Sequence, residues 1–182
     1  MKRLLPIATL VVVAVLAAGC GSSSQPPTTA EWADGVCTSI TTWADSVRSA
    51  VDPIASGDVS KDSLQGAADD VKSATDTLGS DLKDLGKPDT AAGQQAKSSI
   101  DQLSSELSAN ADSIKTAVDG VSGVSGIASA VTTVTTTLGT MKTEISSTYT
   151  SLKQLDAKGE LQTAFEQSSS CQSLSGALST SS

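Results

Sequence analysis

Three cysteines, Cys20, Cys37 and Cys171, are the residues of this chain whose chemistry is most readily predicted. A thiol can carry a thioether, form a disulfide, bind a metal ion or act as a nucleophile, and its surroundings decide which. The 182-residue chain contains no histidine, which is the commonest general base and metal ligand. Histidine-assisted catalysis is therefore excluded, and we expect neither a metal site nor a cofactor.

The surroundings of Cys20 indicate covalent lipidation. A basic start, Met1-Lys2-Arg3, precedes an apolar run over residues 4–18 of the length that secretory signals use. The run ends in Leu16-Ala17-Ala18-Gly19-Cys20, which resembles the lipobox of bacterial lipoproteins, although leucine is commoner than Ala17 at its position. The resemblance implies cleavage between Gly19 and Cys20, a diacylglycerol thioether on Cys20, and a further acyl chain, such as palmitate, on its amine.

Two other outcomes of this segment stay open. An ordinary secretory signal, cleaved without lipidation, is the stronger alternative. A retained transmembrane anchor is disfavoured, because a helix that spans a bilayer needs roughly 20 apolar residues. With lipidation, we expect the protein on the cell membrane, facing outside the cytoplasm. No twin-arginine pair precedes the apolar run, which predicts export in the unfolded state, without a cofactor inserted beforehand.

Cys37 and Cys171 remain once Cys20 carries the lipid. An even pair in an oxidising compartment predicts one disulfide. The chain-entropy model gives about 4–5 kcal/mol of stabilisation for a closed loop of this length. Two separately buried thiols are the alternative.

The charge balance excludes several partners. Without residues 1–19 the chain keeps ten lysines and arginines against 20 aspartates and glutamates, a net charge of −10. Such an acidic chain repels phosphate backbones, so nucleic-acid binding is not expected. A polybasic attraction to the membrane is excluded as well, which leaves the lipid as the contact with the bilayer.

Apolar residues recur at steps of three and four through most of the chain, which predicts an all-α protein. A flexible tether over residues 20–29 precedes a single helical domain over residues 30–178, and residues 179–182 form a frayed tail. We predict helices over residues 30–52, 60–86, 90–119, 125–156 and 160–178. Pro53 should end the first of them, since proline disfavours helical geometry in the residue before it. Residues 131–137 favour a strand by propensity, but the helical spacing continues through them.

The predicted architecture is an up-down four-helix bundle with a short fifth helix and one disulfide. It depends on a turn at Gly120, Gly123 and Gly126, because three glycines cost roughly 1 kcal/mol each within a helix. One long helix with a close-packing glycine face is the alternative. With the turn, the fourth helix ends where the first begins, and the fifth can bring Cys171 beside Cys37. Without it, the two cysteines lie at opposite ends.

Two other patterns are candidate binding sites. Trp32 and Trp43 are three helical turns apart and share a face, so they form either a ligand platform or part of the core; we favour the core. Asp62, Asp69 and Asp76 repeat every seven residues, but they lack the turn and ligand spacing of a calcium loop. They predict a solvated acidic face.

No catalytic motif accompanies these residues. The chain has no G-x-S-x-G, P-loop or dinucleotide fingerprint, so we expect that the protein is not an enzyme. We expect a membrane-anchored binding or scaffold module of the cell envelope, built as a helical, coiled-coil-like domain, with an envelope protein as its partner. The alternative is a carrier that holds a small apolar ligand, such as a lipid or glycolipid, between its helices.

Two further stretches carry a resemblance to a group of proteins. Trp32-Ala33-Asp34-Gly35-Val36-Cys37 and the segment from Phe165 to Cys171 are similar to parts of short, Ala/Ser/Thr-rich actinobacterial lipoproteins with one cysteine in the first mature helix and one near the end. The resemblance implies a location and a build, and it implies no active residues.

The substitution Cys20→Ala tests the lipobox. We expect it to abolish labelling of the protein by an alkyne fatty acid in growing cells, because the thioether needs the thiol. The neighbouring Ser22→Ala is the matched control and should label like the wild type. Unchanged labelling of the Cys20→Ala protein would refute the lipobox assignment.

Overall fold

The computed structural model describes residues 26–179, so Gly19, Cys20 and most of the predicted tether lie outside the described residues. Six α-helices follow one another in the described part of the chain. They are α1 (Thr29–Ala55), α2 (Lys61–Asp84), α3 (Gly93–Asp119), α4 (Gly123–Gln154), α5 (Glu160–Gln167) and α6 (Ser169–Ser179).

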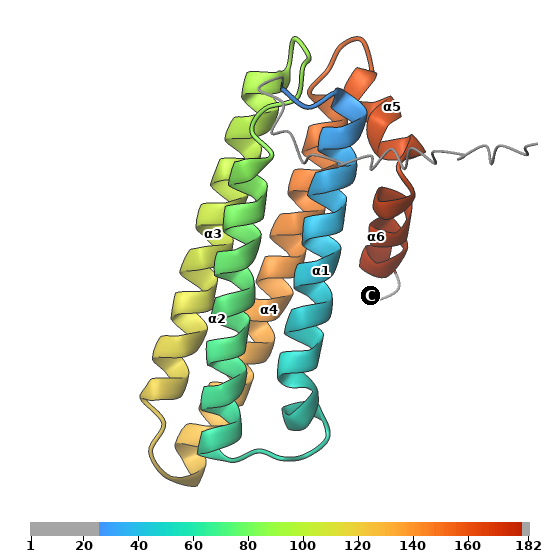
Figure 1. The fold of residues 1–182 in the computed structure, drawn as a ribbon. Helices are drawn as coiled ribbons and strands as arrows, with labels where there is room; N and C mark the ends of the chain where they lie inside the picture. The colour runs from blue at the N-terminus through green and yellow to red at the C-terminus, as the bar shows by residue number, and fades with distance from the viewer. Residues whose placement is uncertain (1–25, 180–182) are drawn as a thin grey trace, which may run out of the picture.

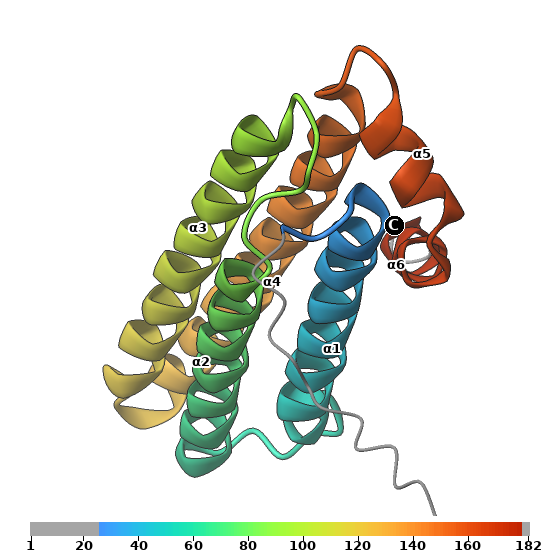
Figure 2. The same cartoon turned by 45° about the horizontal axis from the view of Figure 1, so that its top comes forward.

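The first four helices alternate in direction along one bundle, and α5 and α6 fold back against α1 (Figures 1 and 2). The predicted all-α bundle is therefore confirmed. The predicted single helix over residues 160–178 is wrong in one respect, because Ser168 adopts an extended conformation and divides it into α5 and α6.

Local sequence signals fix several helix ends. Thr28 and Glu31 form a reciprocal capping box at the start of α1, in which the Thr28 amide donates to Glu31 Oε2 over 2.9 Å. Ser60 caps α2 in the same way with Ser63. Gly86, which follows α2, takes a left-handed conformation with φ of 64°, as its place after an apolar run predicts.

Pro53 does not end the first helix, contrary to prediction. Helix α1 continues through it to Ala55, and the Ser56 amide still donates to the Asp52 carbonyl over 2.9 Å. Pro53 has no amide hydrogen to donate to the Ser49 carbonyl, but only two helical residues follow it, so little of the helix depends on the hydrogen bond that is lost. The chain leaves the helix at Gly57, whose φ of 100° few other residues adopt.

A turn lies at each end of α3. A turn over residues 120–122 separates α3 from α4, and Gly123 has a φ of 65°, so the alternative of one long helix is wrong. Helix α4 begins two residues before the predicted start. Helix α3 begins at Gly93, three residues later than predicted, because a turn in which Thr90 Oγ1 accepts from the Ala92 amide precedes it.

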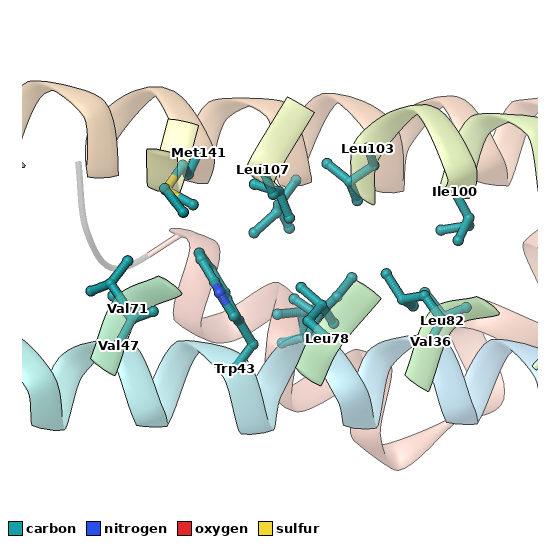
Figure 3. Packing of buried hydrophobic residues seen from close by; sticks show 14 of the residues in the cluster. Val36, Trp43, Val47, Val71, Leu78, Leu82, Ile100, Leu103, Leu107 and Met141 are labelled. Atoms are coloured by element: carbon teal, nitrogen blue, oxygen red, sulfur yellow. The ribbon is translucent and has the colours of Figure 1, made fainter. Parts of the chain in front are cut away.

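The core runs the length of the bundle and is built from the predicted apolar stripes (Figure 3). Leu103, Leu107 and Ile114 of α3 are fully buried, and so is Met141 of α4. Leu78 of α2 is 2% exposed. Each such side chain contributes about 1.5–3 kcal/mol on burial. The β-branched residues 131–137 are helical, because the three-four spacing of α4 buries Val134 against this core.

The predicted disulfide is present, and it holds the C-terminal helices against α1. Cys37 of α1 and Cys171 of α6 are bonded, with their Cα atoms 4.9 Å apart, and both residues are fully buried. Beside them, Ser168 Oγ donates to Asp34 Oδ1 over 2.8 Å and accepts from the Cys171 amide over 3.2 Å. The extended Ser168 thus turns the chain so that α6 runs back along α1.

Removal of the disulfide tests its part in the fold. The double variant Cys37→Ala/Cys171→Ala should lose about 4–5 kcal/mol of unfolding free energy, because the bond closes a loop of 134 residues. Urea denaturation of the variant and of the oxidised wild-type protein measures this loss. Chemically reduced wild-type protein, which keeps both side chains, is the control and should lose a similar amount. A loss below about 1 kcal/mol in both would contradict the chain-entropy account.

Candidate functional site

The two tryptophans lie in the core, and neither presents a flat face to solvent. Trp32 is fully buried, its Nε1 donates to the Gly86 carbonyl over 3.2 Å, and its ring meets Phe165 edge to face at 6.1 Å between centroids. Trp43 is 7% exposed, and its Nε1 donates to Thr75 Oγ1 over 3.1 Å. A shared ligand platform therefore does not form, but Trp43 also reaches the floor of a surface groove.

This groove follows the outer junction of α1 and α2 and has a volume of about 680 Å³. Most of its lining residues are polar, although apolar and polar atoms contribute similar shares of its surface. Side chains with hydroxyl groups lie on both walls, and three carboxylates lie among them. We call it the α1–α2 groove. It is lined by Ser39, Thr42, Trp43, Asp45, Ser46, Ser49, Ala50, Asp70, Ser73, Ala74, Thr77, Leu78 and Asp81.

Small side chains leave the groove open. Beside the contact line of two helices, long lysine, arginine and glutamate side chains usually cover the apolar seam with their methylene stems. Here α1 places Ser39, Thr42, Ser46 and Ser49 along that line, at steps of three and four. Their short side chains leave open a polar channel over the edge of the core.

The carboxylates of the groove have few cationic neighbours. Asp70 and Asp81 make no side-chain hydrogen bond or ion pair within residues 26–179. Asp45 has only Arg48, at 3.6 Å, and both side chains are about 70% exposed. An ion pair so exposed contributes little, so the groove keeps a negative potential.

The opposite edge of α2 is different, because lysines there pair with the aspartates. Lys72 Nζ lies 3.1 Å from Asp112 Oδ1, and Lys115 Nζ lies 2.7 Å from Asp69 Oδ1, so both pairs join α2 to α3. The hydrogen bond to Asp112 raises the pKa of Lys72, and the hydrogen bond to Asp69 raises the pKa of Lys115.

These pairs also change the interpretation of the three aspartates of α2 that repeat every seven residues. Asp69 and Asp76 accept from lysines, whereas Asp62 lies in the first turn of α2, where a negative charge favours the helix dipole. The acidic face is therefore partly neutralised as well as solvated. Within the described residues, no group of three or more His, Cys, Asp or Glu side chains is arranged to hold a metal ion.

Two smaller hollows lie elsewhere on the bundle. One, of about 360 Å³, follows the junction of α3 and α4, where Asn110 Nδ2 donates to Glu144 Oε2 over 2.8 Å. The other, of about 380 Å³, lies where α4 meets α5. There Lys153 lies 3.4 Å from Glu166, and a hydrogen bond from Gln162 lowers the pKa of Glu166, with Lys153 adding to the effect. Both hollows have polar linings whose charged groups already have partners.

No protein-family model, curated protein or solved structure matches this chain. In the described part of the chain, none of the helices combines the length and the apolar character that crossing a membrane requires. The α1–α2 groove is thus identified by its own geometry. The serines and threonines of α1 recur at helical spacing beside the apolar stripe, but this pattern alone did not predict a groove.

The hydrogen bond below the groove gives a stability test. Thr75 is 3% exposed, accepts from Trp43 Nε1, and donates to the Val71 carbonyl over 2.8 Å. Thr75→Val keeps the shape but leaves the indole N–H buried without an acceptor, which should cost about 1–3 kcal/mol of unfolding free energy.

Thr77→Val is the matched control for that experiment. Thr77 makes the same hydrogen bond to the helix, to the Ser73 carbonyl over 2.9 Å, but it is exposed on the groove wall. Its change should stay within about 0.5 kcal/mol in the same urea denaturation. Equal losses for the two variants would show that the Trp43 bond contributes nothing measurable.

Proposed function

We propose that the protein is a lipid-anchored module of the cell envelope, held on the membrane outside the cytoplasm, which binds or positions another molecule and has no catalytic activity. The observation that carries the proposal is the segment from Leu16 to Cys20, with the basic start and apolar run before it. That segment lies outside the described residues, so the support for lipidation comes from the sequence.

The disulfide agrees with this location. Disulfides persist in oxidising compartments outside the cytoplasm and are rare within it. The bond between Cys37 and Cys171 joins residues far apart in the chain and is buried with no exposed surface, which is typical of a structural bond. A structural disulfide of this kind is what an exported protein needs and a cytoplasmic one seldom has.

The bundle is oriented by the point where the tether enters it. Helix α1 begins at the end of the bundle where α2 meets α3 and α4 meets α5 (Figure 1). Pro27, in the last part of the tether, accepts from the Asp89 amide over 3.2 Å, so the tether is attached to that end. A lipid on Cys20 would hold this end within ~30 Å of the bilayer, at about 3.3 Å per residue.

The shape of the surface supports a binding module over an apolar carrier. A carrier needs an enclosed apolar cavity, whereas the three hollows described above are open to solvent, and most of the residues that line them are of polar type. A large exposed apolar patch is not part of the described surface either, where Val59 and Val124 are the exposed large hydrophobic residues. The surface therefore favours recognition through polar and charged groups.

Cell fractionation tests the location. Wild-type protein should sediment with membranes, resist extraction with high salt, and be digested by protease added outside the permeability barrier of the cytoplasm. The Cys20→Ala protein should be extracted from membranes by high salt without detergent. It lacks the acyl chains, whose burial contributes about 0.8 kcal/mol per methylene.

A control separates anchoring from folding. The Cys37→Ala/Cys171→Ala protein keeps the lipobox and should remain with the membrane even though its bundle is less stable. Wild-type protein found soluble in the cytoplasm, with Cys37 and Cys171 open to alkylation, would overturn the proposed function.

A further inference from the structure

We infer that the α1–α2 groove is the docking site for a basic helix of a partner protein, with lysine or arginine side chains facing the three carboxylates of the groove. The inference deepens the proposed binding role and rests on it, but it does not depend on the lipid anchor.

The register of α1 against α2 shows how the charges are spaced. The hydrogen bond between Trp43 and Thr75 places these residues opposite each other in the antiparallel pair. Asp45 on α1 therefore lies at a level between Asp70 and Asp81 on α2. The two α2 aspartates are eleven residues apart, which is about 16 Å along the helix at 1.5 Å per residue. Carboxylates thus alternate between the walls over three helical turns.

The hydroxyl groups of the groove add to its preference for cations. Ser46 Oγ donates its proton to the Thr42 carbonyl over 2.9 Å, and Thr77 Oγ1 donates to the Ser73 carbonyl over 2.9 Å. Their remaining lone pairs are acceptors only. Together with the carboxylates, these two hydroxyl oxygens offer acceptors that suit ammonium and guanidinium donors.

The same helix already binds another helix through such groups. On its neighbouring face, Asp34 accepts from Ser168 over 2.8 Å, and Thr38 Oγ1 donates to Ser170 Oγ over 3.2 Å, where α6 lies along α1. The disulfide beside these residues brings the Cα atoms of Cys37 and Cys171 to 4.9 Å from each other. The groove lies on the adjacent face of α1 and is lined there by the same small polar residue types. No helix of the described chain lies along it (Figures 1 and 2).

A helix fits these observations better than a sugar. Sugar sites stack the ring on an exposed aromatic face, but Trp43 is 7% exposed and supplies only part of the floor. A second copy of this chain is disfavoured, because its acidic surface would face the acidic groove. The length of about three turns, the walls of small residues and the carboxylates, of which Asp70 and Asp81 have no cationic partner among the described residues, together favour a basic helix.

Site-specific photocross-linking in cells that make the full-length protein tests the inference. A benzophenone amino acid replaces Ser46 in the groove or, as a control, Ser105 on the exposed side of α3. We expect the Ser46 position to give a protein adduct whose cross-linked segment, mapped by mass spectrometry, is helical in pattern and rich in lysine or arginine. The Ser105 position should not give this adduct.

Charge variants identify the groups responsible. In the Ser46-labelled protein, Asp45→Asn/Asp70→Asn/Asp81→Asn should lower the adduct yield about tenfold, as the loss of three exposed ion pairs predicts.

The control removes three charges elsewhere, by Asp58→Asn/Asp84→Asn/Asp89→Asn, and should leave the yield unchanged. These side chains are exposed and do not line the groove. The inference is overturned by any of four results: no adduct at Ser46, an adduct with a glycan or a second copy of this chain, a cross-linked segment without basic residues, or an equal loss in both charge variants. Fatty-acid labelling of the same samples reports on the lipid anchor separately, so failure of one proposal is distinguishable from failure of the other.

Discussion

The packing of Phe165 between Trp32 and Tyr149 joins the beginning of the bundle to its end, and the remaining structure depends on it. The ring of Phe165 meets both neighbours edge to face, at 6.1 and 5.3 Å between centroids. Helices α1 and α4 do not pack closely against each other along their lengths, whereas α5 lies against both. The short C-terminal helices therefore do for this bundle what direct contact between the first and fourth helices does in others. The buried disulfide holds them in place.

Serine and threonine form much of this protein, and many of them lie within its helices. Residues of these types usually compete with the helix, since their hydroxyl groups bond to nearby backbone. Here many of them donate to the carbonyl four residues earlier, as Thr41 does to Cys37 and Thr143 does to Gly139. The helix geometry is kept, and the hydroxyl oxygen is left as an acceptor at the surface. Short side chains also allow close approach between helices; a Cβ on Gly79, for example, would lie 2.9 Å from Ser104 Oγ.

Apolar spacing predicts the helices, and the two cysteines predict how they are arranged, because a disulfide between Cys37 and Cys171 requires the turn before α4. The details that escaped prediction depend on individual residues and their neighbours. Pro53 is tolerated because Gly57 ends the helix just after it. Ser168 breaks the last helix because its hydroxyl group bonds to Asp34, which is distant in sequence. The α1–α2 groove could not be predicted from α1 alone, since it needs the register against α2 to bring the three carboxylates to one channel.

The acidic character of the chain connects the proposed anchor with the proposed groove. A bundle with a net charge of −10 is repelled by the anionic headgroups of a membrane, so a lipid anchor would hold it near the surface without drawing its sides onto it. The groove begins about ten residues into α1, roughly 15 Å from the tethered end at 1.5 Å per residue, and it runs along the bundle. With the proposed anchor, repulsion from the bilayer would keep the groove accessible from the aqueous side. The same charge that disfavours nucleic acid and anionic lipid would attract the proposed basic partner over distances near the Debye length, about 8 Å at physiological salt.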